Sequence, residues 1–121
     1  MIERTTQPLP LRLGHSGENR AVCVRFALGG YEALFPGGRP ALLVKRYADA
    51  EAYPVQLERE GDCARWVVSA ADTAKAGPGV CELQWLAGET VVKSDAFPFV
   101  VAEALIPAAE EAPEPYTDWL T

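Results

Sequence analysis

The chain has little of what catalytic and metal sites use: one histidine, one methionine and three cysteines in 121 residues. The histidine, His15, lies in "GHSGE", where Glu18 replaces the second glycine of a nucleophile elbow. A serine–histidine pair at Ser16 would need a second, distant histidine as its base. There is no Cys-x-x-Cys pair and no acidic run of the calcium-loop type. We therefore expect a turn at His15, no enzyme, and no metal or cofactor.

Long apolar runs and a basic face are also missing. No stretch approaches the roughly 20 apolar residues of a membrane span, and the first residues, "MIERTTQPLP", lack the apolar region of a secretory signal. Residues 1–101 carry 11 basic and 12 acidic side chains, whereas residues 102–121 carry five acidic and no basic ones. We expect a protein made in a reducing cytoplasm that binds neither membrane nor nucleic acid.

The three cysteines are expected to be free thiols, since their number is odd and no export signal is visible. In "RAVCVRFAL" the core-facing set is Val22, Val24 and Phe26, which turns Cys23 away from the core. In "VCELQW" the apolar set includes Cys81, which should face inward. These opposite faces exclude a disulfide between them.

Short runs with a period of two predict strands along most of residues 8–101. We expect strands at 8–13, 20–28, 40–47, 53–60 and 63–69, then a hairpin in "GPGVCELQWLAGETVVKSDAFPFVV", residues 77–101. Pro54 removes a ladder donor, so its strand should lie at a sheet edge, where Glu58 and Glu60 would discourage aggregation. The inward sets before and after Asp95 differ in parity, which predicts a bulge there. Expected core residues are Trp66, Leu83, Trp85, Phe97 and Phe99.

Two glycine-containing segments interrupt the strands. "GGYEALFPGGR", residues 29–39, is predicted as a flexible loop, since no phosphate-binding motif follows it. In "SAADTAKAGPG", Ser69 and Asp72 have the spacing of a capping box, and Gly77-Pro78 is typical of a helix stop. We expect one helical turn here, crossing between two sheets.

This pattern predicts an all-β protein: an immunoglobulin-like, antiparallel β-sandwich of about seven strands with an extended C-terminal tail. The predicted domains are residues 1–101, the sandwich, and residues 102–121, an acidic, proline-rich connector in which Thr117 could begin a helix. Apolar side chains in a segment that cannot form its own core indicate a contact surface, with a solvated linker as the alternative. The predicted partner-binding residues are Leu105, Ile106, Tyr116, Trp119 and Leu120.

Several of these stretches look familiar together. "AVCVRFAL", an edge hairpin and "DTAKAGPGVCELQWLAGETVVKSDAFPFVV" resemble the immunoglobulin-like N-terminal domains of phage and prophage tail and baseplate proteins, similar to the baseplate upper protein family. Ala74, Gly77, Val92-Lys93-Ser94 and Phe97, Phe99 and Val100 carry the resemblance. The ending "EPYTDWL" looks like the connector that such proteins place before a stalk. Such proteins usually continue well past this length.

The resemblance implies a non-enzymatic structural module of the virion, assembled in the bacterial cytoplasm with other tail or baseplate proteins and possibly with further copies of itself. The alternative is an immunoglobulin-like adhesion or carbohydrate-binding module of a bacterial surface protein. That alternative predicts an exposed aromatic platform in the Gly29–Gly38 loop, with Tyr31 and Phe35 as the ligand-binding residues. Fold alone does not decide between them.

Overall fold

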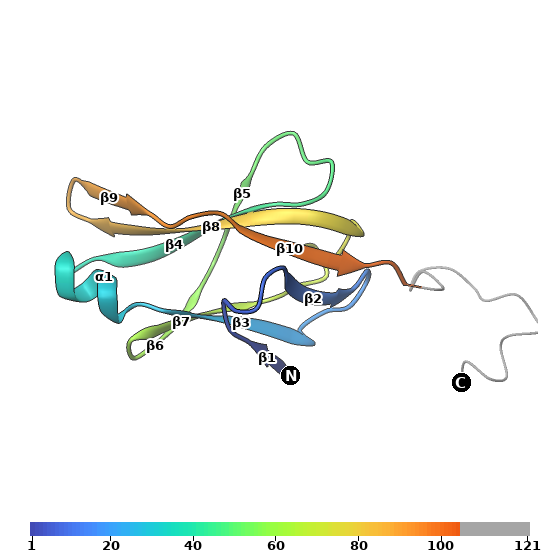
Figure 1. The fold of residues 1–121 in the computed structure, drawn as a ribbon, viewed down its shortest axis with the longest axis horizontal. Helices are drawn as coiled ribbons and strands as arrows, with labels where there is room; N and C mark the ends of the chain where they lie inside the picture. Colours follow the sequence, from blue (N-terminus) through green and yellow to red (C-terminus); the bar gives the residue numbers. More distant parts are fainter. Residues whose placement is uncertain (105–121) are drawn as a thin grey trace, which may run out of the picture.

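A computed structural model describes residues 1–104 of the chain, and all structural statements below concern these residues. Two β-sheets pack face to face, with the described chain ending at the opposite end of the molecule from its one short helix (Figure 1). The four-stranded sheet has the order β1 (Ile2–Arg4), β3 (Val22–Ala27), β7 (Cys63–Val67), β6 (Glu58–Glu60). The six-stranded sheet has the order β2 (Leu11–His15), β10 (Phe97–Ala102), β8 (Gly77–Ala87), β4 (Arg39–Lys45), β5 (Tyr53–Val55), with β9 (Thr90–Lys93) also paired to β8.

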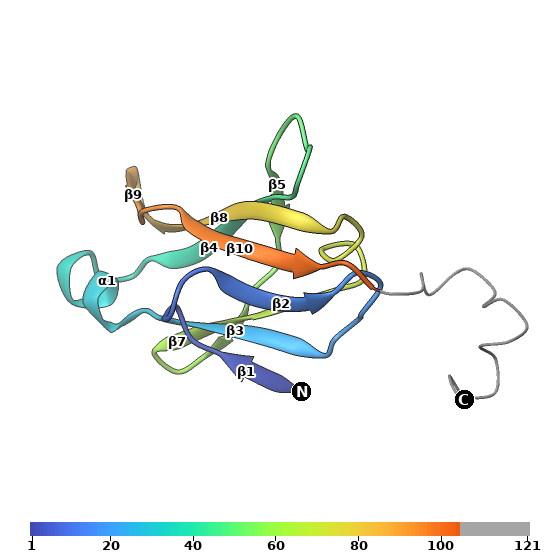
Figure 2. The same cartoon turned by 45° about the vertical axis from the view of Figure 1, so that its right-hand side comes forward.

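The predicted all-β sandwich is confirmed, with more strands than the pattern suggested and with mixed sheets. β1 runs parallel to β3 and β2 runs parallel to β10, while the other pairings are antiparallel. Both parallel pairs involve the N-terminal segment, in which β1 and β2 join different sheets (Figure 2). The pattern missed β1 because three residues are too few for a visible alternation.

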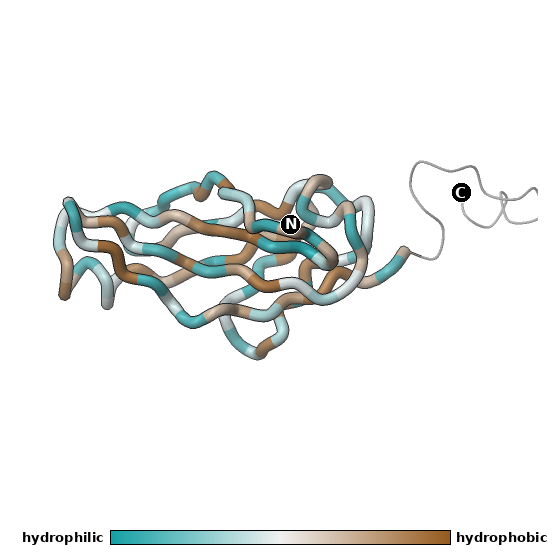
Figure 3. Tube along the Cα trace, turned by 90° about the horizontal axis from the view of Figure 1, so that it is seen from above, coloured by the Kyte–Doolittle hydropathy of each residue, from teal (hydrophilic) through white to brown (hydrophobic). Residues whose placement is uncertain are grey.

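The core lies between the sheets, and the alternation that predicted it is correct. Hydrophilic and hydrophobic residues alternate along the strands (Figure 3). The inward side chains of β3 are Val22, Val24 and Phe26, all buried. Four of the five predicted core residues are at most 3% exposed: Trp66, Leu83, Trp85 and Phe99. Phe97 is half-buried and packs on Phe26 with ring centroids 5.7 Å apart.

The predicted strand 53–60 was wrong as a single element. The chain forms β5 in the six-stranded sheet, leaves it at residues 56–57, and forms β6 in the four-stranded sheet. Both pieces are edge strands, as Pro54 and the exposed Glu58 and Glu60 indicated. Period two continues through such a crossing, so alternation alone does not reveal it.

The predicted helical turn forms as a single turn, in which the amide of Thr73 donates to the carbonyl of Ser69 at 3.2 Å, and it crosses from β7 of one sheet to β8 of the other. Residues 70–75 form turns, and Gly77 begins β8 rather than ending a helix. A helix, α1 (Gly29–Leu34), forms inside the segment predicted as a loop. Two leading glycines disfavour a helix by propensity, and tertiary contacts override that preference. The capping-box contact itself forms without a helix, since the amide of Asp72 donates to Ser69 Oγ at 3.3 Å.

The hairpin that ends the sandwich has the predicted parity change. Lys93 pairs with Gln84 and Phe97 pairs with Cys81, so three residues of one strand face two of β8. This extra residue is the predicted bulge around Asp95. The cysteines also follow the pattern: all three are free, Cys81 lies in the core, and Cys23 faces outward beneath Arg65 Nη2 at 3.7 Å.

Candidate functional site

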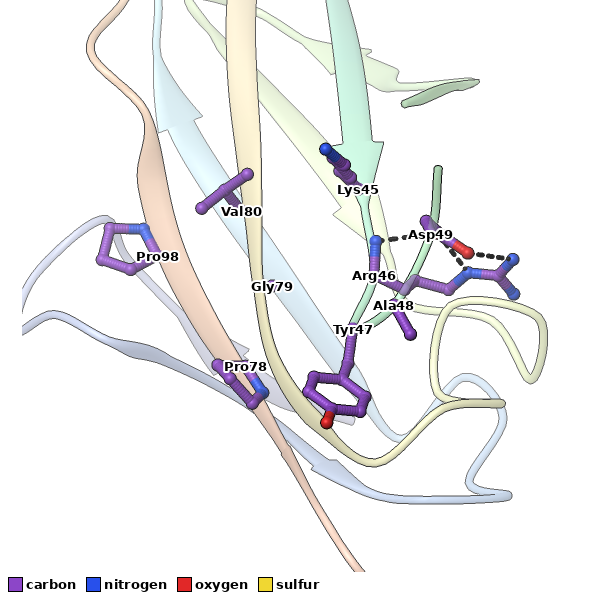
Figure 4. Close-up of a pocket in the computed structure, with 9 residues that line it drawn as sticks. All are labelled: Lys45, Arg46, Tyr47, Ala48, Asp49, Pro78, Gly79, Val80 and Pro98. Atoms are coloured by element: carbon purple, nitrogen blue, oxygen red, sulfur yellow. Dashed lines mark hydrogen bonds and ion pairs between the residues drawn. The ribbon is translucent and has the colours of Figure 1, made fainter. Parts of the chain in front are cut away.

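An open groove of about 440 Å³ lies on the outer side of the six-stranded sheet, between the end of β4 and the adjoining parts of β8 and β10 (Figure 4). Its lining is mostly apolar, and Lys45 and Arg46 are its basic residues. The remaining lining residues are Tyr47, Ala48, Asp49, Pro78, Gly79, Val80 and Pro98. Sequence reasoning missed this groove, because its parts come from three segments that only the sheet brings together.

Two glycines shape the groove. At Gly77, φ is +127°, and a Cβ would lie 2.8 Å from the ring of Tyr47, so glycine lets this ring pack on the backbone of β8. At Gly79, a Cβ would come within 2.4 Å of the ring of Phe99 and 2.6 Å of the carbonyl oxygen of Lys45. β4, β8 and β10 can therefore approach closely at the groove floor only with glycine here.

The loop that carries Tyr47 is held by charge-assisted hydrogen bonds. Asp49 accepts from the Arg46 amide at 2.8 Å, from Arg46 Nε at 2.9 Å and from Lys75 Nζ at 2.6 Å. The Arg46 side chain, followed by Lys75, holds the pKa of Asp49 well below its usual range. Arg46 also donates from Nη1 to the carbonyl of Ala71 at 2.9 Å. The contacts between Arg46 and Asp49 at the wall of the groove are the dashed lines of Figure 4.

A buried carboxylate joins the two sheets behind this loop. Asp72 is 2% exposed and accepts hydrogen bonds from Tyr53 Oη at 2.6 Å, Trp66 Nε1 at 3.0 Å, and the Ser69 amide and hydroxyl at 2.8 and 3.0 Å. Tyr53 belongs to the six-stranded sheet and Trp66 to the four-stranded one. Burial and the bond to Asp72 raise the pKa of Tyr53. With four donors, Asp72 serves the fold and has little capacity left for a ligand.

The outer faces of the two sheets differ in chemistry. The outer side of the six-stranded sheet has exposed or half-buried apolar side chains, which we call the apolar face: Leu43, Tyr47, Pro54, Pro78, Val80, Ala96, Pro98 and Val100. The polar residues Lys45, Glu82 and Gln84 lie among them on the same side. Tyr47 is 54% and Val80 is 41% exposed. The outer face of the four-stranded sheet instead carries ion pairs of Arg25 with Glu3 and Glu60, and of Arg65 with Glu60, at 3.4–3.7 Å. The apolar side chains are therefore concentrated on the outer side of the six-stranded sheet, where exposed apolar surface is typical of contact sites.

Tyr31 and Phe35, the predicted alternative ligand residues, lie in α1 and at its C-terminal end. Tyr31 stacks on Trp85 with centroids 6.0 Å apart, and Trp85 Nε1 donates to the carbonyl of Phe35 at 2.8 Å. Both side chains are half-buried against the core, and the exposed apolar residue of this end is Leu34, at 76%. The two aromatic residues are brought together, but as packing rather than as an exposed platform.

The remaining candidate residues lie at the end of β2 or outside the described residues. His15 ends β2, and the predicted turn follows it, closed by the amide of Glu18 donating to the carbonyl of His15 at 3.1 Å. The Nδ1 of His15 lies 2.9 Å from Glu18 Oε1, and the amide of His15 donates to the same carboxylate. Within residues 1–104 no group of three or more metal-ligating side chains comes together, and no helix there is long and apolar enough to cross a membrane. The predicted partner-binding residues lie beyond residue 104: Leu105, Ile106, Tyr116, Trp119 and Leu120.

Comparison with known proteins shows a likeness of fold to solved structures. No protein-family profile and no curated protein sequence matches the chain. Among solved structures, the N-terminal domain of phage TP901-1 ORF48 is similar, with a TM-score of 0.51 over 84% of this chain and 99% of that one. The two sequences are 13% identical, so the likeness concerns the fold. It covers nearly all of a domain that, in the phage protein, is N-terminal.

Proposed function

We propose that this chain is a structural module of a phage or prophage tail or baseplate. The observation that carries the proposal is the fold likeness to an N-terminal domain of a phage protein, over 99% of that domain. It agrees with the independent sequence resemblance to N-terminal domains of tail and baseplate proteins. On this proposal the chain is a virion component that assembles in the bacterial cytoplasm, and its partners are other phage proteins.

The strand order supports the finer proposal of an immunoglobulin-like sandwich. In such domains strands B, E and D lie in one sheet and G, F and C in the other. The orders β3-β7-β6 and β10-β8-β4 fit these positions in chain order as well. The parallel pairing of β1 with β3 is the departure, and it concerns the first three-residue strand.

The proposed role is non-enzymatic, and two features favour contact over chemistry. The buried carboxylate of Asp72 already accepts hydrogen bonds from Tyr53, Trp66 and Ser69, which join the two sheets. The apolar face around Tyr47 and Val80 is exposed, and such a surface is suited to contact with another protein. No observation favours the adhesion or carbohydrate-binding alternative, because Tyr31 and Phe35 are packed against the core.

The experiment that tests the proposal is mass spectrometry of purified particles from the strain that encodes the chain, after phage induction. We expect the chain in tail or baseplate fractions at a fixed ratio to known tail proteins. A deletion of its gene should give particles that lack a complete tail tip in electron micrographs. Intact, infectious particles from which the chain is absent would refute the proposal.

A further inference from the structure

We infer that the C-terminal segment 113–121 binds the groove of its own domain, against Tyr47, Val80 and Pro98. The groove is open, apolar and unoccupied by the described residues. The segment lies beyond residue 104 and holds three large apolar side chains, those of Tyr116, Trp119 and Leu120. The inference goes beyond the proposed phage role and does not depend on it.

The chain leaves the sandwich close to the groove. β10 passes the groove at Pro98 and ends at Ala102. The amide of Ser16 donates to the carbonyl of Ala102 at 2.8 Å, and the amide of Ala104 donates to Ser16 Oγ at 3.1 Å. These bonds anchor the exit point, so the segment that follows starts from a fixed position at the groove end of the sheet (Figure 1).

The chain between Ala104 and Trp119 is long enough to reach the groove. Ala104 lies six residues beyond Pro98, so their separation is at most about 20 Å at the rise of a strand. Trp119 lies fifteen positions beyond Ala104, and a chain of that length spans at most about 50 Å when fully extended, which exceeds this separation. A short tether that can span its two sites gives an effective concentration on the order of millimolar. Binding within one molecule therefore prevails over binding between copies at micromolar concentration.

The chemistry of segment and groove is complementary. Tyr47, Pro78, Val80 and Pro98 present apolar surface without side-chain hydrogen-bonding groups other than the tyrosine hydroxyl. Lys45 is exposed at the same place and has no ion-pair partner among residues 1–104, whereas Arg46 is paired with Asp49. The segment offers aromatic side chains together with Glu114 and Asp118 and has no basic residue. The aromatic side chains of the segment would cover the apolar surface of the groove, and its carboxylates would pair with Lys45.

Two other surfaces suit this segment less well. The outer face of the four-stranded sheet is covered by the ion pairs of Arg25 and Arg65. The exposed Leu34 lies at the α1 end, opposite the point where β10 leaves the sandwich (Figure 2). A segment tethered at Ala104 would have to cross the length of the molecule to reach it.

The test uses the full chain labelled with 5-fluorotryptophan and observed by ¹⁹F NMR. Trp66 and Trp85 are buried, so the third signal, identified by its loss in Trp119→Phe, reports the tail alone. A soluble gadolinium chelate measures how accessible each signal is. In the unmodified chain we expect the Trp119 signal to be broadened several-fold less than in Val80→Glu, at low and at high micromolar concentration alike.

Matched variants separate groove binding from general effects. Val91→Glu changes another exposed valine of the same sheet, and Lys93→Glu another exposed lysine, and neither should move the Trp119 signal. Lys45→Glu should expose it in part. Unchanged Trp66 and Trp85 signals verify that each variant folds. The inference is overturned if Trp119 is fully accessible in the unmodified chain, or if its protection appears only at high concentration together with the mass of a dimer.

Discussion

Replacing Asp72 by alanine should destabilise the sandwich strongly, because this carboxylate is the polar link between the two sheets. It is 2% exposed and accepts hydrogen bonds from Tyr53, Trp66 and Ser69. The substitution leaves these donors without their acceptor. A buried donor without a partner costs about 1–3 kcal/mol.

The magnitude follows from the burial of the three donors. Trp66 is fully buried, so its indole N–H bears the whole penalty, whereas Tyr53 and Ser69 are half-buried and can turn toward water. We therefore expect a total loss of about 3 kcal/mol in the free energy of unfolding. For a domain of this size that corresponds to a fall in Tm of roughly 12 °C or more.

The assay is urea unfolding followed by tryptophan fluorescence, with Asp62→Ala as the control. Asp62 is an exposed acid of the β6–β7 turn, and its replacement should change the free energy of unfolding by less than about 0.5 kcal/mol. The cycle with Trp66→Phe should show coupling, because phenylalanine removes the buried donor. If Asp72→Ala costs no more than Asp62→Ala, the carboxylate does not join the sheets as described.

Three further predictions concern acid, packing and thiols. The fold lowers the pKa of Asp49, so ionised Asp49 stabilises the folded state fully above its unfolded pKa, near 4. This stabilisation is lost as the pH falls through the lower pKa of the folded state. In Asp49→Asn, Tm should therefore fall less on acidification than in the unmodified chain. Gly79→Ala should cost about 1–3 kcal/mol of unfolding free energy, since a Cβ there meets backbone oxygen at 2.6 Å, whereas Gly30→Ala in α1 meets nothing within 4 Å and should be neutral or stabilising by urea unfolding. Burial raises the pKa of the Cys81 thiol to about 12. In an absorbance assay with a disulfide reagent at neutral pH, Cys63 should therefore react in the native protein, and Cys81 only after denaturation. Rapid reaction of all three thiols in the native protein would contradict this burial.

Local alternation predicted most of the core residues, although Phe97 is half-buried rather than buried. Val22, Val24 and Phe26 on one strand and Cys81, Leu83 and Trp85 on another face inward, because side chains in a strand alternate strictly and only one face meets the opposing sheet. The same counting predicted the bulge near Asp95, since an extra residue is visible as a change of parity. The charge asymmetry of residues 102–121 is likewise a property of the chain alone.

Tertiary structure decided how these pieces are joined. Residues 53–60 divide between two sheets, and residues 29–34 form a helix that packs Tyr31 on Trp85, although neither event alters the local pattern. The groove at Tyr47, Val80 and Pro98 exists because β4, β8 and β10 become neighbours, and residues 47 and 98 are far apart in the chain. Alternation is set by the geometry of each strand, whereas sheet membership and grooves depend on contacts between segments distant in sequence.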